Sequence, residues 1–576
     1  MHGSCEETAV IEAGPTRGHD AARRVALCSR QRTAGIDAYD LAAALLLGTL
    51  LVLLGATFGA YAISNDEEVQ QRYGELIVAY YQSGFADQAL FHFKDLYLYG
   101  GLFDVVAVGL EKLLPLHPYA VRHVLSALTG VGGIAAVWAT ARAIAGTRAG
   151  LLAAAAITVC GTWYGAMFNH TKDIPFAAAM MGATYFLLRI GRELPRPRWH
   201  LVASFGVLCG CALGIRVLGL FLLGYAGLVV LLHAPIGRGK TRRDVATFIA
   251  RSTVTLIPGV LIAYAIMIAA WPWAALAPLN PLRALFTFAD LHYPIYTMLA
   301  GHIYRMNDVP RWYAPTYIAI KLTLPLLIGA GLALVFALLP QRIGGTINNP
   351  CRKEIAFVAV AASLPLLCDV AVRGSDFTGM RHFLFLAPPI AVLAGAGLNG
   401  ALDRLAGHGR FAMQAALALV LLALVWDASR LYRLHPDEYL FYNPLVGGLA
   451  GASRRYATDY WVNIMPEAVA DLERYLDRTE GASGHALRNR RYLVVVCGER
   501  LPFENRADAR LQWARDWHHA DFFIAPTHMN CDRALEGRAV ATIKRLGVPI
   551  GVVKDLRSVS RQGFAQSLAP PVHPAK

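Results

Sequence analysis

The chain has 576 residues, of which 56% are hydrophobic and only 16% are charged. Soluble globular proteins have about 25% charged residues, so this composition excludes a soluble protein and indicates a membrane protein. We assign the net charge of +14 to cytoplasmic loops near anionic lipids, because no nucleic-acid-binding motif accompanies it. Nucleic acid is therefore not expected as a partner.

The chain begins with a polar, arginine-rich stretch at residues 1–36. The apolar run that follows is too long for a signal peptide, so we expect a cytoplasmic tail and an uncleaved first span. A spanning helix needs roughly 17 to 25 apolar residues. Eleven spans are predicted, although 200–233 could also be one broken helix: 38–62, 120–141, 149–167, 174–190, 200–214, 217–233, 252–271, 316–339, 355–372, 383–401 and 411–427. The expected fold is thus an all-α polytopic module over 37–428.

Arginine and lysine concentrate in every second connection between these spans. After the tail they fill the segments ARAIAGTR, RIGRELPRPR, GRGKTRR, PCRK and LDRLAGHGR. Basic connections stay in the cytoplasm. We therefore expect a multi-pass protein of the bacterial inner membrane with its N-terminus in the cytoplasm. The remaining connections, where chemistry is expected, would lie on the periplasmic face.

Two of these outer connections are long, at 63–119 and 271–315. The first contains amphipathic, tyrosine-rich helical repeats, which suit helices lying in the headgroup plane. The second mixes prolines with aromatic residues. A belt of anchoring aromatics explains it at least as well as a substrate-binding role.

Hydropathy falls after the last span, and residues 429–560 are expected to form a small periplasmic α/β domain. RRYLVVVCGE, ADFFIAP and VPIGVVKDL have strand character, whereas GRAVATIKRLG is predicted to be a helix that ends at its glycine. Cys497 and Cys531 lie in this exported part and could pair. Residues 561–576 are expected to be disordered.

Ionisable residues at the outer ends of spans are candidates for chemistry, because charge is costly at membrane depth. Asp66 and Glu67 follow the first span in SNDEE, and His170, Lys172 and Asp173 lie in FNHTKDIPFA. The acidic pair could also be a solvated cluster, and Asp173 could serve as a helix cap.

Cations form the other half of the predicted site. Lys172, Arg216 and Arg381, which is followed by His382 in RHFLFLAPP, are expected at one outer depth. Such a group suits the phosphate of a lipid carrier, although residues snorkelling at the interface would need no partner. A carboxylate base with phosphate-binding cations is what sugar transfer from a polyprenyl phosphate requires. A second carboxylate could orient the acceptor, bind a lysine or hold a divalent cation.

The order of SNDEE, FNHTKDIPFA and RHFLFLAPP along the chain resembles the bacterial GT-C-fold, protein O-mannosyltransferase-like glycosyltransferases. This superfamily, glycosyltransferase family 39 in the wide sense, includes the aminoarabinose transferases. The segment LHPDEYLFYNPLVGGLAGASRRYATDYW also resembles a stretch of bacterial members, and the resemblance covers most of 38–465.

The resemblance implies roles for individual residues. Asp66 is the expected catalytic base with Glu67 as its usual neighbour, and Asp173 matches the second acidic position. Lys172 is expected to contact the donor phosphate or to pair with Asp66. Arg72 and Tyr73 look like the Arg-Tyr pair of the aminoarabinose transferases, at a longer spacing.

Together these patterns predict an inverting glycosyltransferase that uses a polyprenyl-phosphate-linked sugar and an envelope acceptor, which is a lipid, a glycan or a protein. No insertion could hold the MIR domain of the eukaryotic enzymes, which favours a lipid or glycan acceptor. Arg72, Tyr73, His170 and His382 are expected to line the substrate site.

Two alternatives remain at this stage. A flippase or transporter of lipid-linked sugars would show paired broken helices and internal repeats, and the sequence reveals neither. A non-catalytic scaffold for envelope assembly would have no need of Asp66 and Asp173.

Overall fold

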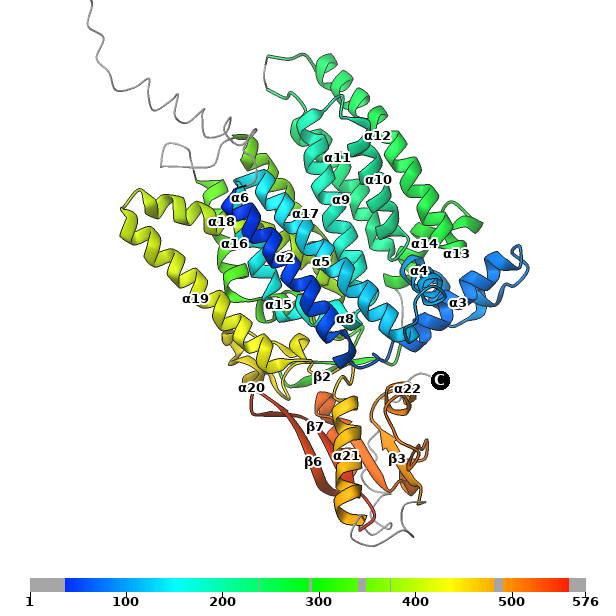
Figure 1. Cartoon of the computed structure of the whole chain (residues 1–576). Helices are drawn as coiled ribbons and strands as arrows, with labels where there is room; N and C mark the ends of the chain where they lie inside the picture. Colours follow the sequence, from blue (N-terminus) through cyan, green and yellow to red (C-terminus); the bar gives the residue numbers. More distant parts are fainter. Residues whose placement is uncertain are drawn as a thin grey trace, which may run out of the picture.

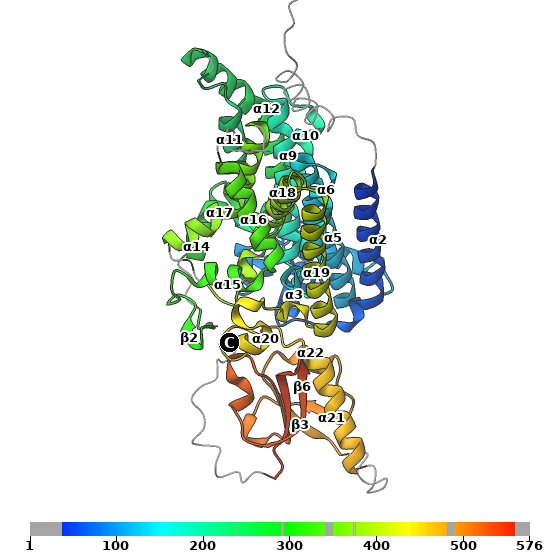
Figure 2. The same ribbon diagram turned by 90° about the vertical axis from the view of Figure 1, so that its left-hand side faces the viewer.

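The structure is a computed structural model that describes residues 37–237, 239–289, 293–339, 349–372, 374, 376–480 and 490–558. The expected tails at 1–36 and 561–576 lie outside these residues. A bundle of long helices carries a smaller domain with a β-sheet on one of its ends (Figure 1). The same two-part arrangement is seen from the side (Figure 2).

Seven of the described helices are long and apolar enough to cross a membrane. They are α2 (Ala38–Thr57, extended by η1, Phe58–Ala60), α5 (Pro118–Ala145), α9 (Asp173–Glu193), α12 (Arg242–Ala270), α17 (Asn349–Val372), η6 with α18 (Arg381–Leu386 and Ala387–Ala406) and α19 (Arg410–Leu434). The prediction of a polytopic helical protein is confirmed.

Two further apolar stretches are bent pairs of helices. The helix α6 (Thr147–Thr158) meets α7 and α8 (Gly161–Tyr164 and Ala166–Asn169) at 67°, and α15 (Tyr313–Lys321) meets α16 (Leu324–Leu338) at 111°. The expectation of no paired broken helices is therefore wrong. At the second break Leu322 and Thr323 are extended, and Pro325 favours a new helix start over continuation of α15.

The stretch at 200–233 forms two separate shorter helices, α10 (Trp199–Leu213) and η4 with α11 (Val217–Leu220 and Phe221–His233). Arg216 lies in the extended break between them. The eleven predicted spans correspond to the seven long helices, the two bent pairs and these two shorter helices.

Small residues allow the central helices to pack closely. A Cβ atom at Gly397 in α18 would lie 1.9 Å from the carbonyl oxygen of Gly329 in α16, so only glycine fits there. Such contacts replace the hydrophobic driving force that lipid does not supply. Because α18 is largely buried, its preceding turn η6 is fixed at the end of the bundle that carries the small domain.

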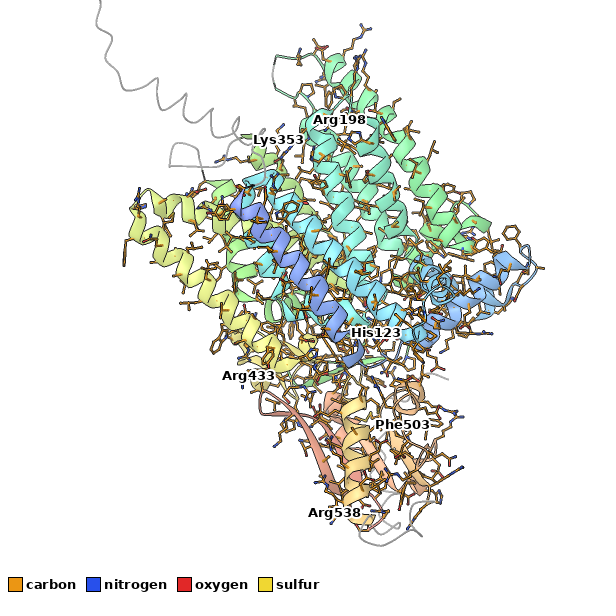
Figure 3. The ribbon with its side chains drawn as sticks, in the orientation of Figure 1. His123, Arg198, Lys353, Arg433, Phe503 and Arg538 are labelled. Carbon is orange, nitrogen blue, oxygen red and sulfur yellow. A yellow bond between two sulfur atoms is a disulfide. The ribbon has the colours of Figure 1, made fainter. Side chains whose placement is uncertain are left out.

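The basic connections gather at the opposite end of the bundle. Figure 3 places Arg198 and Lys353 at that end, far from Phe503 and Arg538 of the small domain. Ion pairs hold these connections, for example that of Arg192 with Glu354 at 2.5 Å.

The loop at 63–119 contains α3 (Glu67–Gln82), η2 (Ala89–His92), η3 (Leu96–Leu98) and α4 (Leu102–Glu111), which confirms its helical character. The loop at 271–315 contains α13 (Pro272–Leu276), α14 (Asn280–Ala289) and an antiparallel hairpin of β1 (Tyr296–Leu299) and β2 (His302–Arg305).

After α19, the chain runs through η7 (Glu438–Leu440), η8 (Pro444–Val446) and α20 (Gly448–Ala452) along the end of the bundle. The small domain follows with α21 (Met465–Glu480), β3 (Tyr492–Val496), α22 (Arg500–Glu504), β4 (Leu511–Trp513), η11 (Trp517–His519), β5 (Phe522–Pro526), η12 (His528–Arg533), β6 (Arg538–Arg545) and β7 (Val548–Asp555). The sheet order is β4-β3-β5-β7-β6, with β3 parallel to β4 and β5 and with β7 antiparallel to β5 and β6. The predicted C-terminal α/β region is confirmed, and Cys497 forms a disulfide with Cys531.

One element of this domain differs from its prediction. The segment GRAVATIKRLG forms strand β6 and not a helix. Leu546 and Gly547 both have positive φ and make the two-residue turn of a hairpin, so Val548 pairs back onto Arg545. The glycine therefore ends a strand, where the sequence pattern suggested the end of a helix.

Candidate active site

Arg381 joins two carboxylates at the end of the bundle nearest the small domain. Its Nη2 donates to Asp66, and its Nε donates to Oδ2 of Asp173 at 3.0 Å. Arg216 donates to the other oxygen of Asp173. The side chains of Asp173, Arg381 and Arg216 are 3%, 8% and 12% exposed, whereas the side chain of Asp66 is 42% exposed. Only Asp66 therefore combines a fixed position with access for a substrate.

The two carboxylates are free to meet arginines because neither caps its helix. Asp173 is the first residue of α9, and the capping position falls on Lys172, so the predicted cap at Asp173 is wrong by one residue. Asp66 occupies the cap position of α3, but its side chain makes no capping bond.

Hydrogen bonds tie the two loops that carry these carboxylates. Ser64 Oγ donates to the carbonyl of Asn169 at 3.2 Å, and Thr171 Oγ1 donates to Oε1 of Gln70 at 2.5 Å. Residues on either side of Asp66 thus hold the turn that precedes Asp173, which fixes the spacing between the two acidic positions.

Lys172 supplies a third cation to this cluster. Its ammonium lies over the ring of Tyr99, 4.6 Å from the ring centre. Burial lowers the pKa of Lys172, and the charges of Asp104 and Asp66 oppose that shift. Within the part of the chain that the structure describes, its Nζ makes no hydrogen bond or salt bridge, so the predicted pairing with Asp66 is wrong: Arg381 takes that position. Three cations against two carboxylates leave one excess positive charge.

Three other predicted site residues lie apart from the cluster. The buried carboxylate of Glu67 accepts from the backbone N–H of Ser64 at 2.7 Å and pairs with His123 at 3.1 Å. Arg72 pairs with Glu75 on the exposed side of α3, and the hydroxyl of the buried Tyr73 donates to the carbonyl of Tyr99. The predictions that Glu67 is catalytic and that Arg72 and Tyr73 line the substrate site are not supported by these positions.

His382 follows Arg381 in η6. Its ring packs edge-on against Phe377 at 4.4 Å between the ring centres. The predicted role of His382 in lining the substrate site stays a prediction.

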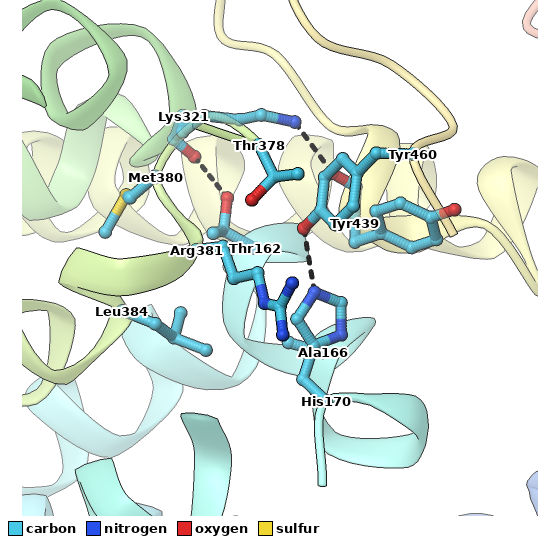
Figure 4. A pocket seen from close by; sticks show the side chains of 10 residues that line it. All are labelled: Thr162, Ala166, His170, Lys321, Thr378, Met380, Arg381, Leu384, Tyr439 and Tyr460. Atoms are coloured by element: carbon cyan, nitrogen blue, oxygen red, sulfur yellow. Dashed lines mark hydrogen bonds between the residues drawn. The ribbon is translucent and has the colours of Figure 1, made fainter. Parts of the chain in front are cut away.

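A narrow pocket opens beside Arg381 (Figure 4). In this view the guanidinium of Arg381 points toward His170, whose Nε2 lies 2.7 Å from the Tyr460 hydroxyl. Burial lowers the pKa of His170 to about 3, so the imidazole is neutral at physiological pH. The pocket is lined by Thr162, Ala166, His170, Lys321, Thr378, Met380, Arg381, Leu384, Tyr439 and Tyr460.

Three residues of this region were not predicted from the sequence. Lys321 is buried at the bend between α15 and α16, and its Nζ donates to the carbonyl of Tyr439 at 2.7 Å. Trp461 lies against Arg381, and Tyr460 beside it contacts His170. Lys321 was recognisable as an ionisable residue in an apolar run, whereas the two aromatic residues carried no signal beyond the resemblance of their segment.

A site for a divalent cation was one possibility raised by the sequence. In the described ranges no group of three or more His, Cys, Asp or Glu side chains could hold a metal ion.

Residues 118–273 match the family model described as dolichyl-phosphate-mannose-protein mannosyltransferase. This part of the chain is similar to that mannosyltransferase family. The match includes Lys172, Asp173 and Arg216, and it confirms the resemblance predicted from the sequence motifs. No curated protein matches the chain.

Among solved structures, the chain is similar to ArnT from Cupriavidus metallidurans in the apo state, at 15% identity over 89% of this chain and 97% of ArnT, with a TM-score of 0.46. The same protein bound to undecaprenyl phosphate gives 17% identity over 88% and 97%, with a TM-score of 0.44. The archaeal oligosaccharyltransferase AglB from Archaeoglobus fulgidus, in complex with an inhibitory peptide and a dolichol-phosphate, gives 12% identity over 84% and 69%, with a TM-score of 0.45. These likenesses establish neither a substrate nor the role of any residue.

Proposed function

We propose that the chain is an integral-membrane inverting glycosyltransferase of the GT-C type. It transfers a sugar from a polyprenyl-phosphate-linked donor to a hydroxyl group of an envelope lipid or glycan. The observation that carries this proposal is the ion cluster in which Arg381 bridges Asp66 and Asp173 beside Arg216 and Lys172. The name of the matching family, which contains a polyprenyl-phosphate sugar, supports the donor class.

The cluster suits a single displacement at the anomeric carbon. The acceptor oxygen attacks that carbon as its proton passes to Asp66, the more exposed carboxylate. The bond from the anomeric carbon to the phosphate oxygen breaks, and polyprenyl phosphate leaves with the electron pair. One displacement inverts the configuration of the sugar.

The cations would stabilise the negative charge of the leaving phosphate. Lys172 makes no salt bridge with the described residues, and Arg216 and Arg381 are held at Asp173, so the cluster can accept the charge of a phosphate. In this proposal Asp173 orients the two arginines and does not take a proton. A phosphate is a good leaving group when its charge is stabilised, so no general acid is needed.

The site would face the periplasm. Figure 3 shows His123, the partner of Glu67, toward the end of the bundle opposite Arg198 and Lys353, and such basic connections remain in the cytoplasm. The proposal therefore includes a cytoplasmic N-terminus and a periplasmic small domain.

The test is a comparison of lipids and envelope glycans from cells with and without the gene, in search of a missing single-sugar increment. Asp66→Asn should fail to restore the increment although the protein is expressed and inserted. Full restoration by this variant would exclude Asp66 as the base. Glu75→Gln, a change in an exposed carboxylate of the same helix, serves as the control.

A transporter of lipid-linked sugars is the second candidate, because the two bent helix pairs resemble the broken helices of transporters. A transporter would move the lipid-linked sugar across the membrane without cleaving it. Accumulation of an intact lipid-linked sugar on the cytoplasmic leaflet of cells lacking the gene would favour this candidate.

A further inference from the structure

One loop of the small domain contacts the segment that carries Asp66. Strand β3 ends at Val496, and the next three residues, Cys497 to Glu499, lead into α22. The disulfide from Cys497 to Cys531 ties this loop to η12. Gly498 passes so close to Val462 that a Cβ atom there would lie 3.1 Å from its side chain. The loop is therefore held on both sides.

Asn65 connects this loop to the residue before the proposed base. The backbone N–H of Glu499 donates to Oδ1 of Asn65 at 3.3 Å, and Nδ2 of Asn65 donates to the carbonyl of Tyr460 at 3.4 Å. One side chain thus joins the small domain, the segment that carries Tyr460 and the loop that carries Asp66.

The carboxylate of Glu499 is unpaired in the part of the chain that the structure describes. Among the residues that the structure describes, it accepts no hydrogen bond and makes no salt bridge, and it does not cap α22. It is nevertheless partly buried. Burial raises the pKa of Glu499, Lys94 opposes this shift, and the charges of Glu68 and Asp66 add to it. A half-buried carboxylate without a partner is stabilised when it accepts a hydrogen bond from a donor group.

We propose that Glu499 binds the acceptor beside Asp66, by accepting a hydrogen bond from a second donor group next to the attacking hydroxyl. This inference rests on the proposed function and deepens it. An acceptor with neighbouring hydroxyls, which means a sugar-bearing lipid or a glycan, satisfies both carboxylates at once. A simple alcohol satisfies only Asp66. The small domain is then one wall of the acceptor site.

The experiment uses the full-length protein in detergent with materials from cells that lack its gene. A polyprenyl-lipid extract serves as donor and an envelope fraction as acceptor, and the product is measured as the single-sugar mass increment. Each is titrated separately against wild type, Glu499→Ala, Glu499→Gln and the control Glu504→Ala. Glu504 is the last residue of α22, the short helix that follows Glu499, and it pairs with Arg500.

For Glu499→Ala we expect the acceptor concentration at half-maximal rate to rise about tenfold, which corresponds to the loss of one hydrogen bond to a charged group. The donor dependence and the thermal unfolding temperature should stay at their wild-type values. Glu499→Gln should show a smaller rise, since its amide still accepts a hydrogen bond, and Glu504→Ala should match wild type.

An unchanged acceptor dependence in Glu499→Ala would overturn the inference and leave the proposed transferase intact. The same holds if donor and acceptor dependences change equally, because that result would indicate a general disturbance of the site. If wild-type protein produces no increment at all, the proposed function fails and the inference fails with it.

Discussion

The guanidinium carbon of Arg381 lies 4.2 Å from the centre of the Trp461 ring. The two residues are 80 positions apart, one at the start of η6 and the other after the last span. Arg381 is thus held from one side by the carboxylates of Asp66 and Asp173 and from the other by an aromatic face.

Trp461→Ala should therefore weaken the proposed reaction without removing any charged group. A partly buried contact between a cation and an aromatic ring contributes about 0.5 to 2 kcal/mol, so we expect a loss of about tenfold in kcat/KM. Trp461→Phe retains a ring and should keep most of the activity. Trp426→Ala, which removes an exposed ring of α19 near Arg430, is the control. Equal losses in Trp461→Ala and Trp461→Phe would assign the effect to the indole N–H, which contacts His170.

Lys172→Met should weaken binding of the donor without lowering the stability of the protein. The substitution removes a buried ammonium that has no salt-bridge partner in the described chain, so the thermal unfolding temperature should stay equal or rise. The donor KM should rise about tenfold or more, since a charge-assisted contact with the phosphate is lost. Lys112→Met, at an exposed position after α4, should change neither quantity. An unchanged donor KM would remove Lys172 from the phosphate site.

Asp173→Asn should lower stability far more than Asp66→Asn. Asp173 is buried and pairs with two largely buried arginines, and removal of one member of a buried ion pair typically costs about 3 to 5 kcal/mol. The measurement is thermal unfolding in detergent, with Asp403→Asn at the exposed partner of Arg148 as control. Addition of Arg216→Met to Asp173→Asn should restore part of the loss, because one uncompensated charge is removed. A double variant as unstable as the single one would show that Arg216 is not the group left without a partner.

His170 should make the folded protein sensitive to acid. Its pKa falls to about 3 in the folded protein from an ordinary value of 6.5, because burial disfavours the charged ring. Between these values the unfolded chain binds more protons than the folded protein, so stability should fall as the pH falls from 6.5 toward 3. The slope contributed by this residue is at most about 1.4 kcal/mol per pH unit. His170→Gln should reduce the slope when unfolding temperatures at pH 7, 6 and 5 are compared, and an identical slope in both proteins would contradict the shift.

Much of the site was predictable because charge near a span is rare. Asp66, Asp173, Lys172, Arg216 and Arg381 were all found by that rule, and the structure brings them together. The rule does not predict, however, in which direction each side chain points. Glu67 follows Asp66 by one residue, which rotates its side chain by about 100° around the helix, and it faces His123 instead.

The other predictions that differ from the structure have similar physical causes. Arg72 lies farther along the same helix on a face that meets solvent, so no local pattern reveals that it leaves the site. Strand β6 was predicted as a helix because its mixed apolar and basic residues suit either period, and only the pairing with β7 decides between them.

The contacts around Asp66 also determine when the site can form. The hydroxyl of Tyr61 bonds to Glu438, the N–H of Ala62 donates to Asn463, and Asn65 accepts from Glu499. These partners are 377, 401 and 434 positions away along the chain. Contacts of such long range close late in folding, because the loop between them must first be ordered. The segment that carries the proposed base is therefore among the first to leave the ribosome and among the last to reach its final position. A chain that ends with α19 at Leu434 would keep every predicted span and still lack all three of these partners.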